Sequence, residues 1–296
     1  MSVVAPDPAH ALTPSGNLRR RELVSRVFVG ATVTAAGLAV AVLFILVYYV
    51  AQRGASHMSL TFLTAQLPSY TGIGGGIGPA IAGSAEIVVI STAIALPVGV
   101  LTAIYLTEFA NPRIAAPIQT ALELLAGLPT IITGLFVAGL LVDRLGQSAY
   151  AAGVALSLIQ VPLIARASME SMARVPHTLR EAADALGVAR WRTITGVILP
   201  TAAGGIVTAT ILAIARAAGE TAPMIFTSSA FQQQYQLNPT QAVPNLPFEI
   251  FQLVDSASPA AISDAWGAAF LLIVLILVTN VAARVWLRRT ERKRGL

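Results

Sequence analysis

The sequence contains no cysteine, one lysine and few charged residues of either sign. The absence of cysteine excludes disulfides, thiolate metal sites and cysteine nucleophiles. The three histidines lie far apart, and none falls in a metal-ligand pattern such as HExxH, which argues against a metalloenzyme. Charged residues make up 11% of the chain, whereas a soluble domain carries about a quarter. The chain is therefore not composed like a soluble enzyme.

Apolar side chains are abundant instead. They make up 55% of the 296 residues, and the mean hydropathy is +0.73. One water-soluble globule could not cover so much apolar surface, so the bilayer is the expected solvent. A helix needs about 20 mostly apolar residues to cross the hydrocarbon core. The sequence predicts an all-α polytopic membrane protein with six transmembrane helices, at residues 27–51, 79–107, 115–142, 149–167, 199–226 and 265–287.

The basic residues predict the orientation of these spans. Sixteen of the 19 Lys and Arg residues flank the spans on one side, and only Arg53 and Arg144 fall on the other, with Arg216 inside the fifth span. The positive-inside rule then places both termini in the cytoplasm, and an even number of spans agrees. Because the arginines flank apolar spans and no basic stretch is interleaved with aromatics, a nucleic-acid partner is not expected.

The segments between and beyond the spans divide the chain further. Residues 1–26 are expected to be a disordered cytoplasmic tail, and residues 288–296 a basic cytoplasmic tail. The first span exceeds the 7–15 apolar residues of a signal-peptide core, so we expect it to stay uncleaved. Two loops are too long to be simple turns: a polar cytoplasmic loop at about 168–198, and an external loop at about 227–264 that lacks Lys and Arg.

The cytoplasmic loop carries a spaced pattern, Glu181-Ala182-Ala183, then Gly187, then Leu199-Pro200. It predicts a short helix over 179–186 that ends at the glycine, where a left-handed or closely packed turn is permitted. A second short helix, from about residue 190, would run into the fifth span, whose first turn tolerates the proline.

A surface helix-turn-helix would account for Glu-Ala-Ala alone, which is common in an alanine-rich chain. The fuller pattern resembles the coupling loop of ABC importer permeases, with Val197 where isoleucine is usual. The resemblance implies that the loop sits in a groove of an ATPase subunit and transmits its closure to the membrane helices. The residues that this implicates are Glu181, Ala182, Ala183, Gly187, Leu199 and Pro200.

The chain itself carries no Walker-type ATPase motif. A Walker A loop places a lysine beside the nucleotide phosphates after a glycine-rich turn, and the one lysine here is Lys293, in the C-terminal tail. No catalytic site and no cofactor are therefore expected in this chain, and ATP with Mg would bind to a separate ATPase subunit.

Charged residues inside spans are functional candidates because they are costly there. Glu86, Glu123, Arg216 and Glu220 are such residues. Arg216 and Glu220 are four apart and should share a helix face. They could form an ion pair that only neutralises itself. Alternatively, the Arg216 guanidinium donates to a tetrahedral oxyanion, while Glu220 holds the arginine and keeps binding weak enough for release. Glu86 would pair with Arg216 or face a water-filled cavity.

Residues 215–223, Ala-Arg-Ala-Ala-Gly-Glu-Thr-Ala-Pro, resemble the G-R-A-x-G-E-T-A-P signature of the A-type permease family of phosphate ABC transporters, with Ala215 in place of the first glycine. Stretches of the second and third spans and the Asn-Leu-Pro at 245–247 agree, so the resemblance covers about residues 72–287. Thr221-Ala222-Pro223 favours the A-type over the C-type subunit. Glu86 departs from the family pattern, in which an apolar residue is expected.

The resemblance implies a type I ABC importer permease fold, with five core spans, an additional N-terminal span and a cytoplasmic coupling helix. It implies a subunit of an ATP-driven, binding-protein-dependent importer of inorganic phosphate in the bacterial plasma (inner) membrane. The implied partners are a homologous C-type permease, an ATPase dimer, an extracytoplasmic phosphate-binding protein and membrane lipid. The implied substrate pathway includes Arg216, Glu220, Glu123, Glu86 and Thr221.

Three other readings stay open at this point. The cargo could be another oxyanion such as sulfate or molybdate. The chain could be an ATP-independent secondary transporter or channel, although the coupling loop speaks against this. An intramembrane enzyme is disfavoured because no histidine lies in a predicted span.

Overall fold

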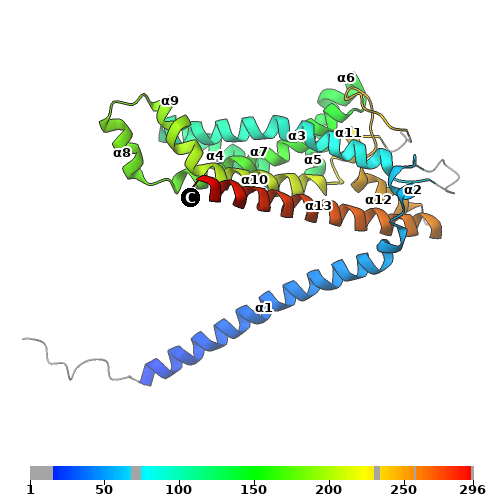
Figure 1. Ribbon diagram of the computed structural model, residues 1–296, viewed down its shortest axis with the longest axis horizontal. Helices are drawn as coiled ribbons and strands as arrows, with labels where there is room; N and C mark the ends of the chain where they lie inside the picture. The colour runs from blue at the N-terminus through cyan, green and yellow to red at the C-terminus, as the bar shows by residue number, and fades with distance from the viewer. Residues whose placement is uncertain (1–15, 68–74, 230–233, 257, 295–296) are drawn as a thin grey trace, which may run out of the picture. The chain divides into compact units, whose positions relative to one another are not determined.

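The computed structural model describes residues 16–67, 75–229, 234–256 and 258–294. Within these ranges every regular element is a helix, which confirms the predicted all-α class (Figure 1). The α-helices are α1 (Gly16–Gly54), α2 (Leu60–Thr64), α3 (Gly78–Ile104), α4 (Pro112–Gly127), α5 (Thr130–Val137), α6 (Asp143–Leu145), α7 (Ala149–Ala173), α8 (His177–Ala185), α9 (Arg190–Thr193), α10 (Leu199–Ala218), α11 (Met224–Thr227), α12 (Leu246–Asp255) and α13 (Pro259–Arg294). A 3-10 turn (Ala55–His57) follows α1, and π-helical segments (Tyr105–Phe109, Ala138–Val142, Ile194–Ile198) extend α3, extend α5 and precede α10.

Six membrane-length features correspond to the six predicted spans, but one of them is broken. Five are continuous helices of sufficient length and hydropathy. The sixth consists of two helical segments, Pro112–Gly127 and Thr130–Leu145, bent by 101°. The continuous ones are Leu18–His57, Gly78–Phe109, Ala149–Ala173, Arg190–Ala218 and Pro259–Val285.

The span predicted over 115–142 is therefore divided into two helices. Leu128 and Pro129 have extended backbone, with ψ of 136° and 130°, and separate α4 from α5. A proline disfavours helical backbone in the residue before it and has no N–H to donate. A Cβ on Gly127 would meet nothing within 4 Å, so the Leu-Pro pair, and not close packing of the glycine, accounts for the bend.

The chain divides into two units, Met1–Ala51 and Gln52–Leu296. In the first unit, α1 is a single helix, long and apolar enough to cross a membrane. The predicted disordered tail over 1–26 needs correction, because residues 16–26 belong to α1 and Arg26 pairs with Glu22 at 3.0 Å. Residues 1–15 lie outside the described part of the chain.

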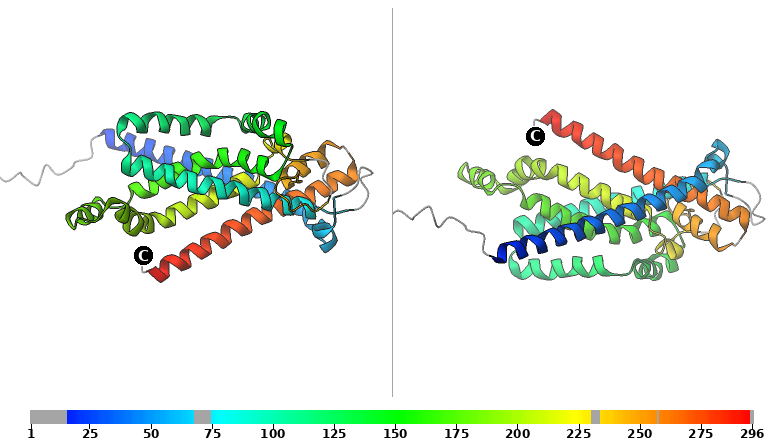
Figure 2. Two further views of the ribbon diagram at one scale, coloured as in Figure 1. Left: turned by 90° about the horizontal axis from the view of Figure 1, so that it is seen from above. Right: turned by 90° about the horizontal axis from the view of Figure 1, so that it is seen from below.

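The second unit is built around α7, against which α3 and α10 pack. Small residues allow the helices to approach closely. A Cβ on Gly153 of α7 would come within 2.5 Å of Ile90, and one on Gly99 of α3 within 2.9 Å of Ile164. Figures 1 and 2 show the three helices running along one another. They form the frame on which the candidate residues are placed.

The two long loops lie at opposite ends of this unit. Figure 2 shows α8, α9 and the end of α13 together at one end, and α6, α11 and α12 at the other. The segment 227–264, expected as a loop, contains α12, which Asn245 caps by accepting from the Phe248 N–H at 3.1 Å. The predicted C-terminal tail 288–296 also needs correction, because α13 continues to Arg294.

Candidate functional site

Arg216 and Glu220 meet at the end of α10. The fifth span was predicted to reach residue 226, but α10 ends at Ala218 and Gly219 forms its C-cap. The Arg216 Nε lies 3.6 Å from the Glu220 Oε1. The two residues thus pair across the end of the helix. The sequence had suggested instead that they share one face of a continuous helix. The Arg216 side chain is 55% exposed, whereas that of Glu220 is 17% exposed.

The turn that carries Glu220 is held by the second half of the broken span. A Cβ on Gly134 of α5 would come within 2.6 Å of the Pro223 Cα, so α5 packs directly on the turn. Thr221, another candidate, lies in this turn, and its carbonyl accepts from the Met224 N–H at 3.1 Å. The break before α5 therefore contributes to the position of the Arg216–Glu220 pair.

The segment before α12 packs on the other side of this region. The Leu246 N–H donates to the Ser84 Oγ of α3 at 2.8 Å, and Asn245 donates to the Ser228 Oγ at 2.7 Å. Ser84 and Asn245 line a small cavity of about 10 Å³ together with Glu220. That volume accommodates about one water-sized probe. The segment 243–247 is thus ordered next to the ion pair.

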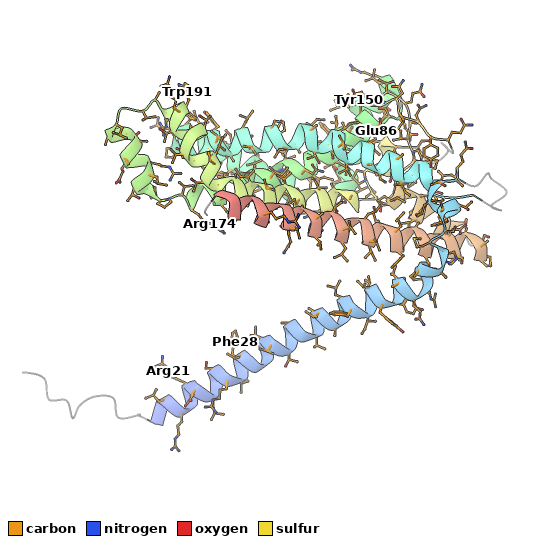
Figure 3. The ribbon with its side chains drawn as sticks, viewed as in Figure 1. Arg21, Phe28, Glu86, Tyr150, Arg174 and Trp191 are labelled. Carbon is orange, nitrogen blue, oxygen red and sulfur yellow. The ribbon has the colours of Figure 1, made fainter. Side chains whose placement is uncertain are left out.

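Glu86 lies on α3, toward the end of the unit that carries Tyr150 and away from Arg174 and Trp191 (Figure 3). Its Oε2 is buried and has no hydrogen-bond partner. Among the described residues no ion pair joins Glu86 to Arg216, so of the two alternatives for Glu86 the structure does not show the pairing. A buried oxygen without a hydrogen-bond partner costs free energy, and no ion pair to Glu86 is found among the described residues.

A second ion pair joins α4 to α7. The Arg166 Nη2 lies 3.5 Å from the Glu123 Oε1. The sequence placed Arg166 at the cytoplasmic end of the fourth span, but α7 continues to Ala173. Arg216 is therefore not the only basic residue within a membrane-length helix. The missed signal is that neither proline nor glycine occurs between Arg166 and Pro176. The pair borders an open groove of about 290 Å³, lined by Gln119, Leu122, Glu123, Arg166, Met169 and Glu170.

Three of these charged side chains, on α10, α7 and α4, are exposed. The exposed fractions are 55% for Arg216, 45% for Arg166 and 67% for Glu123. A charge at the bilayer centre costs about 2.5–3.5 kcal/mol on insertion scales, so lipid is an unfavourable neighbour for a charge at that depth. Chemically, the guanidinium of Arg216 offers planar N–H donors that match a tetrahedral oxyanion. In the described residues, no group of three or more His, Asp or Glu could hold a metal ion.

The loop between α7 and α10 has the predicted local structure. α8 ends at Ala185, and Gly187 has a φ of +67°, the left-handed conformation that glycine adopts without strain. The Gly187 and Val188 N–H groups donate to the carbonyls of Asp184 and Ala183, each at 3.0 Å.

The six residues of the coupling pattern differ in exposure. Glu181 and Ala182 are exposed on α8, and Ala183 is buried. Leu199 packs on a cluster at the base of the loop, and Pro200 is exposed in the first turn of α10.

The same loop exposes one large apolar side chain after α8 and another at the start of the membrane-length helix Arg190–Ala218. Leu186 is 81% exposed and Trp191 is 61% exposed, and Figure 3 places Trp191 at this end of the unit. Exposed apolar groups gathered on a polar segment are typical of protein–protein interfaces.

Two residues at this end were not singled out from the sequence. Glu108, at the end of the π-helical segment after α3, is buried and pairs with Arg180 of α8 at 3.1 Å. Arg180 was only one of the basic residues that predict the orientation of the spans. Glu108 was only part of the stretch at the second span that resembles the permease family. The signal that could have found them is a carboxylate directly after an apolar span, together with an arginine directly before Glu-Ala-Ala.

Comparisons with known proteins show the family of the chain. Residues 95–295 match the family model described as "Binding-protein-dependent transport system inner membrane component". The phosphate transport system permease protein PstA of Yersinia pestis is 37% identical over 235 residues, which are 79% of each chain. The probable phosphate transport system permease protein PstA of Methanocaldococcus jannaschii is 36% identical over 255 residues, 85% of this chain and 89% of that protein.

Two solved structures share the fold at lower identity. A permease chain of the bacterial alginate ABC transporter, solved with its alginate-bound periplasmic protein, gives a TM-score of 0.64 at 16% identity, over 92% of this chain and 96% of that one. The inward-facing MetNI methionine ABC transporter gives 0.59 at 21% identity, over 72% and 94%. The chain therefore belongs to the family of binding-protein-dependent transport system inner membrane components, among the phosphate transport system permease proteins.

Proposed function

We propose that this chain is the A-type permease subunit of an ATP-driven, binding-protein-dependent importer that moves inorganic phosphate across the plasma (inner) membrane. The observation that carries the proposal is Arg216, held by Glu220 at the end of α10 and yet more than half exposed. Its guanidinium can donate two parallel hydrogen bonds to a phosphate, while Glu220 competes for the same donors and limits affinity. The relatives described above are themselves named as phosphate transport permeases.

The exposed charges support a pathway shared with a second permease. In the isolated chain the side chains of Arg216, Arg166 and Glu123 are exposed. Lipid is an unfavourable neighbour for each of these charges. A homologous C-type subunit would cover these faces and enclose a hydrated route between the two chains. Thr221 and the unpaired Glu86 belong to the same proposed route, Glu86 with a partner supplied by that second chain or by the transported ion.

The coupling loop supports a separate ATPase dimer as the energy source. Such subunits bind ATP and Mg, and this chain would bind no cofactor. Glu181 and Ala182 on the exposed side of α8, with Leu186 and Trp191 nearby in sequence, form a surface of mixed apolar and acidic character that suits a groove on a soluble subunit. Closure of the dimer on ATP would move α8, and hydrolysis would reset the complex.

The opposite end supports docking of an extracytoplasmic phosphate-binding protein. The segment 243–247 and α12 form an ordered surface there, anchored to α3 through Ser84. In the proposed cycle the loaded binding protein docks on this end. The membrane helices then open outward, and phosphate passes from the binding protein to Arg216.

This cycle requires both termini to lie in the cytoplasm. Reporters that are active only inside or only outside the cell can be fused to residue 296 and inserted after residue 240. We expect cytoplasmic activity for the first fusion and extracytoplasmic activity for the second. A C-terminal fusion active outside would overturn the orientation and, with it, the assignment of α8 to the ATPase.

Reconstitution tests the function directly. The chain would be purified with its second permease and ATPase subunits and placed in proteoliposomes with binding proteins loaded with phosphate, sulfate or molybdate. We expect ATPase stimulation and uptake with the phosphate-loaded protein alone. Stimulation by another loaded protein would replace phosphate with that oxyanion. Uptake in the absence of ATP and of the ATPase subunit would contradict the importer class.

A further inference from the structure

The coupling helix α8 has little apolar packing against the rest of the chain. Of its nine residues, Ala183 is the buried one. Arg180, on the same helix, is partly buried, with 20% of its side chain exposed. So small a buried face does not fix the position of α8 by itself. Specific polar contacts are therefore needed to hold the helix against the rest of the chain.

Arg180 makes three such contacts with two membrane helices. Its Nη2 lies 3.1 Å from the Glu108 Oε1, beyond the end of α3. The same Nη2 donates to the Met172 carbonyl at 3.0 Å, and Nη1 donates to the Val175 carbonyl at 2.9 Å. Met172 lies in the last turn of α7 and Val175 two residues beyond its end, and the C-terminal end of a helix favours a cation.

Glu108 is a buried end point for this contact. Glu108 is 7% exposed. A buried charge without a partner is costly, and the ion pair with Arg180 compensates this cost. The guanidinium spans all three acceptors because its planar donors point in several directions, which a lysine ammonium on a single stem cannot reproduce.

The apolar surroundings join the same elements. Ala103 of α3, Met172 and Val175 of the α7 end, and Ile194 and Ile198 before α10 form one buried cluster. The segments Tyr105–Phe109 and Ile194–Ile198, which reach this region from α3 and toward α10, are both π-helical. Such wide turns are rare and frequently occur at functional sites. The Glu108–Arg180 contact therefore ties α8 to a point where three membrane helices end.

We propose that Arg180 and Glu108 form the linkage that conveys movement of the coupling helix α8 to the membrane helices α3 and α7. Both are positioning residues, since neither faces the proposed phosphate route. When the ATPase pair moves α8, the guanidinium pulls on the carboxylate beyond α3 and on the two carbonyls that end α7. The inference rests on the proposed importer function, in which α8 contacts the ATPase.

The test is the number of phosphate ions taken up per ATP hydrolysed in the reconstituted complex. The variants are Arg180→Gln, Glu108→Gln, the double variant with both changes, and Arg180→Lys. Arg174→Gln is the matched control, because Arg174 is exposed at the same end of the unit (Figure 3). Assembly and basal ATPase activity are measured for every variant.

We expect Arg180→Gln and Glu108→Gln to assemble and to retain basal ATPase activity, with phosphate per ATP lowered at least tenfold. Arg180→Lys should lower the ratio a few fold, because the charge remains while the three-acceptor geometry is lost. The double variant leaves no unpaired buried charge. If the pair only neutralised itself, this variant would regain the wild-type ratio, and that result would overturn the proposal. The linkage instead requires that the ratio stay low.

Two controls keep the outcome unambiguous. If the neutral variants fail to assemble, Arg180→Lys still decides, and a wild-type ratio in that variant would refute the linkage. Arg174→Gln should match the wild type in every measurement. Failure of the proposed function is distinguishable, because the wild-type complex would then show no ATP-driven uptake. If the wild type transports another oxyanion, the same ratio is measured with that ion.

Discussion

The Cα of Pro223 lies so close to Gly134 that a side chain on residue 134 would clash with it. A Cβ on residue 134 would come within 2.6 Å of the Pro223 Cα. The glycine belongs to α5, behind the Leu-Pro break, and the proline to the turn after the Arg216–Glu220 pair. Two motifs about 90 residues apart in the chain are thus in direct contact through backbone.

Replacing Gly134 with alanine should push α5 and this turn apart. Overpacking of this kind costs about 1–3 kcal/mol, and we expect a lower temperature of thermal unfolding for the detergent-solubilised complex and a loss of phosphate uptake. Gly139→Ala is the matched control, because a Cβ at Gly139 meets nothing within 4 Å. Equal stability and uptake in both variants would show that the contact has no consequence.

Gly187 ends the coupling helix in a conformation that other residues avoid. With a φ of +67°, the change Gly187→Asp should strain the turn by about 1 kcal/mol and misplace the surface that meets the ATPase. Membrane abundance should hold, while uptake and binding-protein-stimulated ATPase activity fall. Gly196→Ala, at a glycine with open space around it and no positive φ, should leave both activities intact.

Glu181→Lys tests the same surface without altering the backbone. Glu181 is exposed and forms no ion pair with the described residues, so the folded chain should tolerate the reversed charge. A loss of stimulated ATPase activity with normal thermal unfolding would place the effect at the ATPase contact. Normal uptake in this variant and in Gly187→Asp would contradict the coupling role of α8.

Local chemistry made some features predictable and left others hidden. The turn at Gly187 follows from a glycine after a helical stretch, and its φ confirms that prediction. The span count followed from hydropathy. Apolar composition predicted the third span as one segment but not the size of its break, which the extended backbone of Leu128-Pro129 produces.

The remaining errors concern contacts between distant residues. Arg166 lies inside α7 and pairs with Glu123 of α4, and Arg180 reaches Glu108 of a different helix. No spacing rule relates the members of either pair, since each depends on how helices pack. For the same reason Glu86 could be recognised as a costly charge, but its failure to meet Arg216 could not.

Glu249 should make the stability of the outer segment depend on pH. Burial in α12 raises the pKa of its carboxyl from 4.5 to about 7. It borders a cavity of about 10 Å³ with Phe62 and Asp264. Because the folded-state pKa lies above the unfolded value, this contribution is fully present below about pH 4.5 and is lost as pH rises through 7. One pKa unit is worth about 1.4 kcal/mol, so the loss is at most about 3.5 kcal/mol.

The measurement is thermal unfolding at pH 5 and pH 8. The variant Glu249→Gln keeps the size of the side chain but cannot ionise, so its unfolding temperature should fall less than that of the wild type between these two values. Asp255→Asn, at the exposed end of the same helix, should retain the wild-type difference. A Glu249→Gln variant with the wild-type pH dependence would exclude ionisation of this residue as its source.

Arg216 should carry the anion-selective step. Arg216→Gln keeps the length of the side chain and some hydrogen bonding but removes the charge, so phosphate uptake should collapse while assembly and basal ATPase activity persist. Arg216→Lys keeps the charge but loses the planar donors, and a partial defect is expected. Uptake of radiolabelled phosphate by the reconstituted complex measures both effects.

The double variant Arg216→Gln with Glu220→Gln separates anion binding from mutual neutralisation. In the single variant Arg216→Gln, Glu220 loses its partner at 3.6 Å, and an unpaired, mostly covered carboxylate could reduce uptake by itself. The double variant removes that charge as well. If Arg216 only balances Glu220, uptake should return in the double variant, which would refute the anion role. If the guanidinium binds phosphate, uptake stays lost, because no neutral amide replaces its charge-assisted donors.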